Sequence, residues 1–266
     1  MRILALFLIL IALPAAAHEF WIEPVDYQPG ADQIITADLV NGQNFSGTRL
    51  LFIPDWFHIF ALIRADQVVP VKSRTGDRPA LQQANLGDGL HIAIYQSEPD
   101  SINYKTFEKF QIFADHKDFK NALQRHRARN LPETNFTESY IRYSKSLIGV
   151  GGGAGRDRRV GLETEFVSLE NPYTTGPMDE FLVKLFDGHE VRPNTQVELF
   201  EKSDKGVVTV TLHRTDANGI ARLPVKPGYA YMADAVILRE PSAELAAKSS
   251  AVWETLWANL TFKIPE

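Results

Sequence analysis

The chain has 266 residues, contains no cysteine and carries a formal net charge of −5 at pH 7. The absence of cysteine excludes disulfides, thiolate metal ligands, a cysteine nucleophile and a lipid-modified N-terminal cysteine. The mild negative charge, without any run of basic residues, argues against nucleic acid or an anionic membrane as a partner. The length suffices for one large all-β unit or two domains of ordinary size.

The first seventeen residues have the pattern of a secretory signal peptide. A positive start is followed by the apolar run Ile3–Leu13 and then by the small residues Ala15–Ala17, the arrangement that signal peptidase cleaves. The run is too short to remain as a membrane-spanning helix, and no second run approaches that length. We therefore expect residues 1–17 to be removed, and a soluble periplasmic or secreted protein without a transmembrane anchor. A bacterial periplasm suits the lack of cysteine better than eukaryotic secretion.

Cleavage after Ala17 would make His18 the first residue of the mature chain. A terminal histidine offers a metal two nitrogens, the α-amine and the imidazole, and the α-amine is a usable ligand because its pKa is only about 8. Signal peptidase accepts almost any residue after the small one, so a terminal histidine also arises by chance. The position predicts metal binding but does not by itself establish it.

Residues 18–107 read as an N-terminal β domain of short strands between turns. Gln33–Leu39 and Gly89–Tyr95 are two expected strands, bounded by glycine-containing turns. In the second strand His91 falls on the face opposite Leu90 and Ile92.

Residues 108–148 are predicted to be helical. Aromatic and apolar residues recur at three- to five-residue spacing from Phe110 to Leu123, with acidic residues early and arginines late, as a helix dipole favours. A second helix is expected from Thr134 to Ile148. The glycine-rich segment 149–159 lacks the context of a phosphate loop and is interpreted as a flexible linker.

Residues 160–266 are again β-rich, with about seven short strands in roughly a hundred residues, typical of a small sandwich. The predicted fold is therefore mainly β. It consists of two β-sandwich domains, of immunoglobulin or transthyretin type, joined by a helical pair and a glycine-rich linker.

Seven histidines are available as ligands, but none has the His-x-x-x-His spacing of a local zinc site. Any site must be assembled by the fold. Besides His18 we single out His91 and His116; His116 lies beside Asp115 and Asp118, carboxylates that can orient a ligating ring. A solvated helix face explains His116 equally well. Of the remaining histidines, His126, His189 and His213 are interpreted as surface residues, and His58 as packed between Trp56 and Phe60.

Sequence signatures of catalysis are absent. There is no Gly-x-Ser-x-Gly, no nucleotide-binding loop and no credible Ser-x-x-Lys, so we expect no catalytic residues and do not expect an enzyme. A copper oxidase with a terminal histidine brace is a minor alternative, because the rest of the chain resembles none of those enzymes.

Several motifs in order resemble one bacterial family. They are His18–Pro24 directly after the leader, Ser139–Lys145, Gly161–Phe166 through Asn171-Pro172, Thr215–Gly219 and Val252–Trp257. Over nearly the whole mature chain these resemble the periplasmic proteins catalogued as domain of unknown function 4198, grouped with NikM-like components of nickel and cobalt uptake.

The resemblance implies a β-rich periplasmic protein connected with a metal, and in NikM-like proteins the N-terminal segment and its histidine hold the ion. Two features depart from that pattern: this chain has no transmembrane helices, and Met232–Val236 contains no histidine where many relatives have one.

The expected function is therefore a binding or accessory protein for nickel, cobalt or copper, held through His18, with His91 or His116 as partners. A metal-uptake transporter or another envelope protein is the expected partner. The alternative is a carbohydrate- or protein-binding β-sandwich without metal, using exposed tryptophans as stacking surfaces.

Overall fold

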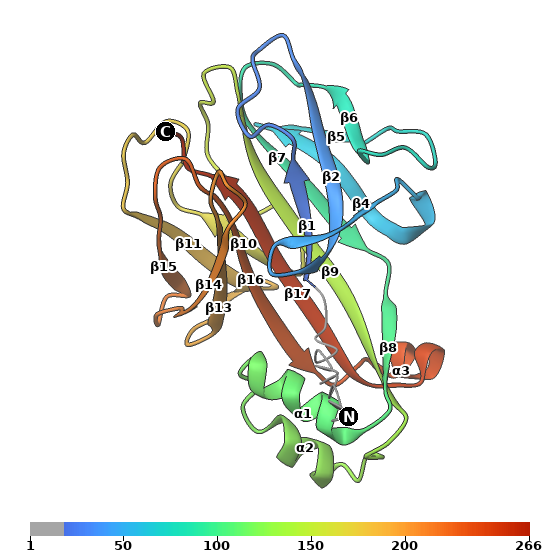
Figure 1. Cartoon of the computed structure of the whole chain (residues 1–266). Helices are drawn as coiled ribbons and strands as arrows, with labels where there is room; N and C mark the ends of the chain where they lie inside the picture. The colour runs from blue at the N-terminus through green and yellow to red at the C-terminus, as the bar shows by residue number, and fades with distance from the viewer. Residues whose placement is uncertain (1–18) are drawn as a thin grey trace, which may run out of the picture.

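The computed structural model describes residues 19–266, so the predicted signal peptide and His18 lie outside the described residues. In the described part the chain forms three sheets, with two helices at one end of the molecule (Figure 1). The prediction of a mainly β fold is confirmed.

A nine-stranded sheet forms the centre of the molecule. Its order is β14-β13-β16-β17-β9-β7-β4-β5, and β8 pairs with one end of β9. The strands are β4 (Phe57–Arg64), β5 (Gln67–Pro70), β7 (Gly89–Ser97), β8 (Asp100–Tyr104), β9 (Phe136–Val150), β13 (Gln196–Lys202), β14 (Val208–Arg214), β16 (Ala230–Arg239) and β17 (Ala251–Lys263). The long strands β9 and β17 run parallel to each other, whereas the other pairs are antiparallel.

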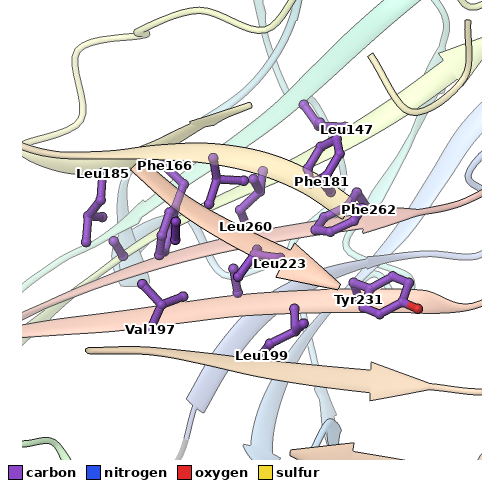
Figure 2. Packing of buried hydrophobic residues seen from close by; sticks show 14 of the residues in the cluster. Leu147, Phe166, Phe181, Leu185, Val197, Leu199, Leu223, Tyr231, Leu260 and Phe262 are labelled. Carbon is purple, nitrogen blue, oxygen red and sulfur yellow. The ribbon is translucent and has the colours of Figure 1, made fainter. Parts of the chain in front are cut away.

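A small sheet covers one face of the central sheet. It contains β10 (Thr164–Ser168), β11 (Glu180–Asp187), β12 (Glu190–Val191) and β15 (Ile220–Pro224). Figure 2 shows the core between the two layers, where Phe166 and Phe181 face Leu199, Leu260 and other buried side chains. This packing of inward-facing side chains from two sheets is that of a β-sandwich.

The opposite face has two covers. A second small sheet of β1 (Glu19–Pro24), β2 (Ile34–Gln43), β3 (Ser46–Leu50) and β6 (Leu81–Ala84) covers one part. The helices α1 (Phe107–His116) and α2 (Ala122–Ala128) cover the end nearest residue 253, where Phe110 stacks on Trp253 and Phe113 on Trp257. Two further short elements are the 3-10 turn η1 (Pro54–Trp56) and α3 (Ala243–Ser249).

The helix expected from Thr134 to Ile148 is wrong, because these residues belong to strand β9. β9 is almost wholly buried and is paired on both sides, with β17 and with β7. A strand covered on both faces shows no alternation of apolar and polar residues. Without that alternation, the apolar residues three and four positions apart in this segment suggested a helix. The first expected helix is present as the pair α1 and α2.

Strand pairing crosses the expected boundary between the two β domains. β9 precedes that boundary and β17 lies at the C-terminal end of the chain, yet they are neighbours in the central sheet. The glycine-rich segment is also held in place: Gly149 N–H donates to Tyr27 O, Gly151 N–H to Pro29 O and Gly152 N–H to Asp88 Oδ2. Division of the chain into two domains stays a prediction. The segment between them is hydrogen-bonded to the surrounding structure.

Candidate functional site

A row of polar residues crosses the central sheet between its two covers. Glu198, Asp234, Asn259 and Ser144 are successive backbone partners in β13, β16, β17 and β9, so their side chains share one face. All four are buried. Burial of this many polar groups costs free energy unless they find partners, which makes the row a candidate site.

Strand β1 lies over this row and is fixed to it by its backbone. Ile22 N–H donates to Ser144 Oγ at 3.3 Å, and Thr261 Oγ1 donates to Ile22 O at 2.7 Å. Trp21, fully buried, packs against Phe45 in the same region. Glu19–Pro24 pairs with β2 as a strand, and the first described residue is held against the central sheet.

Glu19 and Lys117 complete a buried charged cluster with Glu198 and Asp234. Lys117 follows the last residue of α1, and its Nζ lies 2.9 Å from Glu198 Oε1, 3.2 Å from Asp234 Oδ2 and 3.7 Å from Glu19 Oε1. The same ammonium lies 4.8 Å from the centre of the Trp257 ring. We call Glu19, Lys117, Glu198 and Asp234 the carboxylate cluster; it joins β1, α1 and the central sheet.

The cluster contains three carboxylates and one ammonium, and both burial and these charges set the pKa directions. Burial would lower the pKa of Lys117, but the carboxylates outweigh it and raise that pKa. Burial raises the pKa of Glu19 to about 7, and Asp234 and Glu198 contribute to the rise against the opposing effect of Lys117. Glu19 therefore gains or loses its proton near neutral pH.

His116 borders the carboxylate cluster at the surface. Its Nε2 lies 3.4 Å from Glu198 Oε1, and its side chain is 57% exposed whereas that of Glu198 is 3% exposed. Contact with Glu198 raises the pKa of His116. Conversely, burial would raise the pKa of Glu198, but His116 and Lys117 outweigh it and lower that pKa. His116 thus presents one ring nitrogen to a buried carboxylate while remaining open to solvent.

The residue types of the cluster suit a divalent ion, but those described do not form a complete site. Glu19 Oε2 and Asp234 Oδ1 are buried and accept no hydrogen bond from the described residues. Within residues 19–266 there is no group of three or more His, Asp and Glu arranged to hold a metal. His116 and Glu198 would supply two donors, so the remaining donors must come from elsewhere.

The structure places His91 far from this cluster. Its ring is fully buried: Nε2 accepts a hydrogen bond from Leu86 N–H at 2.9 Å, and Nδ1 lies 3.0 Å from Gly89 O. His91 lies on β7, where Tyr95 continues the row that starts at Glu198. Four strand spacings of about 4.8 Å separate β7 from β13, which is roughly 19 Å across the sheet. His91 and His116 are therefore not brought together, and both nitrogens of His91 already serve the loop that precedes β7.

Sequence reasoning missed Glu19, Lys117, Glu198 and Asp234 as members of one site, because no local motif distinguishes them. Proximity to His116 was the one available signal for Lys117. Glu198 and Asp234 reach the site only through the pairing of β13 with β16.

The four tryptophans do not form an exposed row. Trp21, Trp253 and Trp257 are buried, whereas Trp56 is 51% exposed. The indole of Trp253 donates to His126 Nδ1, and His126 is fully buried rather than on the surface as expected. A single exposed indole gives less support to a stacking surface for sugars than an aromatic row would.

Comparison with known proteins places the chain in a family without assigning an activity. The family described as domain of unknown function (DUF4198) matches residues 15–238, and the chain belongs to this family. No curated protein shows significant similarity to the chain. None of the helices in the described part of the chain is long and apolar enough to cross a membrane.

Proposed function

We propose that this DUF4198 member is a periplasmic binding protein for a divalent transition metal, which is held by the mature N-terminal His18 together with His116 and Glu198. Nickel, cobalt and copper are the proposed ions, since these ions take histidine and amine nitrogens readily. The observation that carries the proposal is the position of Glu19. The residue that follows His18 lies in the carboxylate cluster, 3.7 Å from the lysine next to His116.

The distance between His116 and Glu198 supports a shared ion. Ligands that lie about 2.0–2.1 Å from a tetrahedral metal are separated from each other by roughly 3.3 Å. His116 Nε2 and Glu198 Oε1 are 3.4 Å apart. The α-amine and imidazole of His18 would complete four donors, all of types found in transition-metal sites.

Charge also supports the proposal. The cluster holds more carboxylates than ammonium groups, and an added cation would favour the ionised form of Glu19. Lys117 keeps the cluster folded in the metal-free protein, because a buried group of unpaired carboxylates would be strongly destabilising. The free oxygens of Glu19 and Asp234 add negative potential without themselves having to bind the ion.

The periplasmic location is proposed from the signal-peptide pattern, and it supplies the free α-amine that the site requires. The wider role that we propose is delivery of the metal to an uptake transporter, as the NikM-like grouping implies. The open face of His116 would allow a transfer partner to reach the ion.

The test is calorimetric titration of the processed protein, its N-terminus verified by mass spectrometry, with nickel, cobalt, copper and zinc. At least one ion should bind with a dissociation constant below about 1 μM, a free energy of about −8 kcal/mol. One residue added before His18 should weaken binding at least tenfold, because it converts the α-amine to an amide.

Matched variants locate the site. His116→Ala should weaken binding at least tenfold, while His58→Ala, which removes a histidine whose side chain is 66% exposed, should leave it unchanged. If no ion binds below the micromolar range, or if the extended and processed proteins bind alike, the proposal fails.

A further inference from the structure

Arg142 is a buried cation that forms no ion pair with the described residues, although Asp234, Glu19 and Glu138 lie near enough to favour its charged form. It is 8% exposed, and its guanidinium lies 4.0 Å from the ring centre of Trp257 and 4.8 Å from that of Tyr140. Among the described residues its Nη1 has no hydrogen-bond partner, and Glu and Asp side chains are absent from its ion-pairing distance. Burial lowers the pKa of Arg142. A desolvated guanidinium with a free N–H is costly, and an acceptor oxygen brought by a ligand would remove that cost.

Arg142 lines a cavity of about 510 Å³ whose wall combines aromatic and polar side chains. Phe20, Tyr95 and Tyr140 form part of the wall, and the half-exposed Trp56 lies at its edge. Tyr95 Oη and Glu98 N–H both donate to Trp56 O, which fixes the backbone beneath the indole. The volume is in the range of small-molecule sites.

The outer part of the cavity is acidic. Asp55, Glu98 and Asp100 line it and are exposed. Among the described residues no lysine or arginine lies within ion-pairing distance of these three; His58, 3.9 Å from Glu98, is the only basic contact. Asp100 is held by Tyr140, whose hydroxyl donates to Asp100 Oδ2 at 2.7 Å. The acidic groups and the buried guanidinium therefore present opposite charges to one cavity.

From this arrangement we infer that the cavity binds a free amino acid as its zwitterion, with the ligand carboxylate on Arg142 and its ammonium at Asp55, Glu98 and Asp100. A guanidinium can bind a carboxylate through two parallel hydrogen bonds, which adds both energy and geometric specificity, and this favours a carboxylate-bearing ligand over a neutral sugar. The indole of Trp56 would add a cation–π contact to the ammonium or pack on the ligand side chain.

This site is separate from the proposed metal site, although both are next to β1: Phe20 lines the cavity, whereas Glu19 belongs to the carboxylate cluster. The inference does not depend on His18 or on a metal. Measurements in the presence of EDTA keep the two questions apart, since amino acids also chelate metal ions.

The experiment is a thermal-shift screen of the processed protein against each of the twenty L-amino acids at about 5 mM with EDTA, followed by calorimetry of those that raise the melting temperature. A ligand present well above its dissociation constant stabilises the folded state. We expect at least one amino acid to bind with a dissociation constant below about 1 mM, and its N-acetyl and methyl-ester derivatives to bind at least tenfold more weakly.

Variants at the surface keep the test independent of folding. Trp56→Ala and the double variant Asp55→Asn/Glu98→Gln should each weaken binding at least fivefold, whereas Leu212→Ala, at a 62% exposed position on β14, should not. Arg142→Gln should abolish binding if it folds. Absence of amino-acid binding, equal binding of the blocked derivatives, or binding of glucose or maltose in place of amino acids would each overturn the inference.

Discussion

His91 and His126 have the same local arrangement, although one was predicted to bind metal and the other to be on the surface. In each ring one nitrogen accepts a hydrogen bond, from Leu86 N–H in His91 and from the Trp253 indole in His126. The other nitrogen faces a backbone carbonyl, of Gly89 and of Pro132. Rings with both nitrogens engaged stabilise loops, and a metal would have to displace a hydrogen bond.

His91 and His116 should therefore respond to substitution in opposite ways. His91→Ala removes two hydrogen bonds and leaves a cavity, and should lower the free energy of unfolding by about 2–4 kcal/mol. Its metal affinity should not change. His116→Ala, at a position open to solvent, should cost less than about 1 kcal/mol yet weaken metal binding. Urea denaturation measures the stability of both variants, and calorimetry measures their metal affinity. Loss of metal affinity in His91→Ala but not in His116→Ala would contradict the prediction.

The surroundings of His91 also predict a dependence of stability on pH. Burial lowers the pKa of His91, so below the ordinary value of about 6.5 the unfolded chain binds a proton that the folded chain does not. The contribution of His91 is therefore complete above about pH 6.5 and is lost as the pH falls toward the folded-state value.

Urea unfolding at pH 7 and pH 5 measures that loss. The fall in the free energy of unfolding should be smaller in His91→Gln than in the parent protein, since glutamine does not titrate. The other histidines and the acidic residues contribute in both proteins and cancel in the difference. An equal fall in both proteins would show that His91 does not titrate as described.

The sequence predicted His116 as a metal ligand from its neighbours in the chain, whereas the structure supports it through a contact with a distant residue. The neighbours Asp115 and Asp118 were expected to orient its ring, but its contact is Glu198, more than eighty residues away in the chain. Such a pair depends on where α1 sits on β13, and residue types alone carry no information about that.

Among the elements, β9 is fixed to the following segment by a buried ion pair on its other face. Lys145 Nζ lies 2.8 Å from Asp157 Oδ1 and 3.6 Å from Glu165 Oε2, and it also donates to Phe166 O at 2.9 Å. All three side chains are fully buried. The contacts explain why the residues after the glycines pack against the sheet.

Removing this lysine should be strongly destabilising. Lys145→Met leaves the buried Asp157 without its cation, while Glu165 keeps Arg159 at 3.1 Å, and should lower the free energy of unfolding by about 3–5 kcal/mol. Lys205→Met, in the exposed turn after β13, is the matched control and should change it by less than about 0.5 kcal/mol. Chemical denaturation compares them; similar stabilities would mean that the ion pair contributes little.

Elements with a clear local pattern were predictable, and β9, whose apolar spacing fits a helix as well as a buried strand, was not. The alternation in Gly89–Tyr95 correctly predicted β7, and the aromatic spacing after Phe107 predicted α1 and α2. β9 was taken for a helix because its pairing with β17, a strand more than a hundred residues later, supplies the stabilisation that its own sequence pattern does not reveal.

For the whole molecule, the continuous central sheet predicts a single cooperative unfolding transition. Backbone hydrogen bonds between β9 and β17 join the two halves of the chain, and small units that share a core unfold together. Because the natural chain has no cysteine, a single fluorophore can be attached through Asp66→Cys, in the β4–β5 turn, or through Asp204→Cys, in the β13–β14 turn.

The two labels should report the same urea midpoint as the circular dichroism of the unlabelled protein. Midpoints that differ by more than about 0.5 M would indicate two independently unfolding domains, as the sequence suggested. The overall β class was predictable from strand spacing and turns, whereas the sharing of one sheet by both halves depends on long-range pairing.

The most direct test of the metal site is a crystal structure of the processed protein soaked with nickel or zinc, with data collected at the absorption edge of the metal. An anomalous peak is predicted about 2.0–2.1 Å from His116 Nε2 and from the α-amine nitrogen of His18, with Glu198 as a further ligand. A fully loaded crystal with its peak only at His58, His189 or His213, or with no peak near His116, would contradict the account.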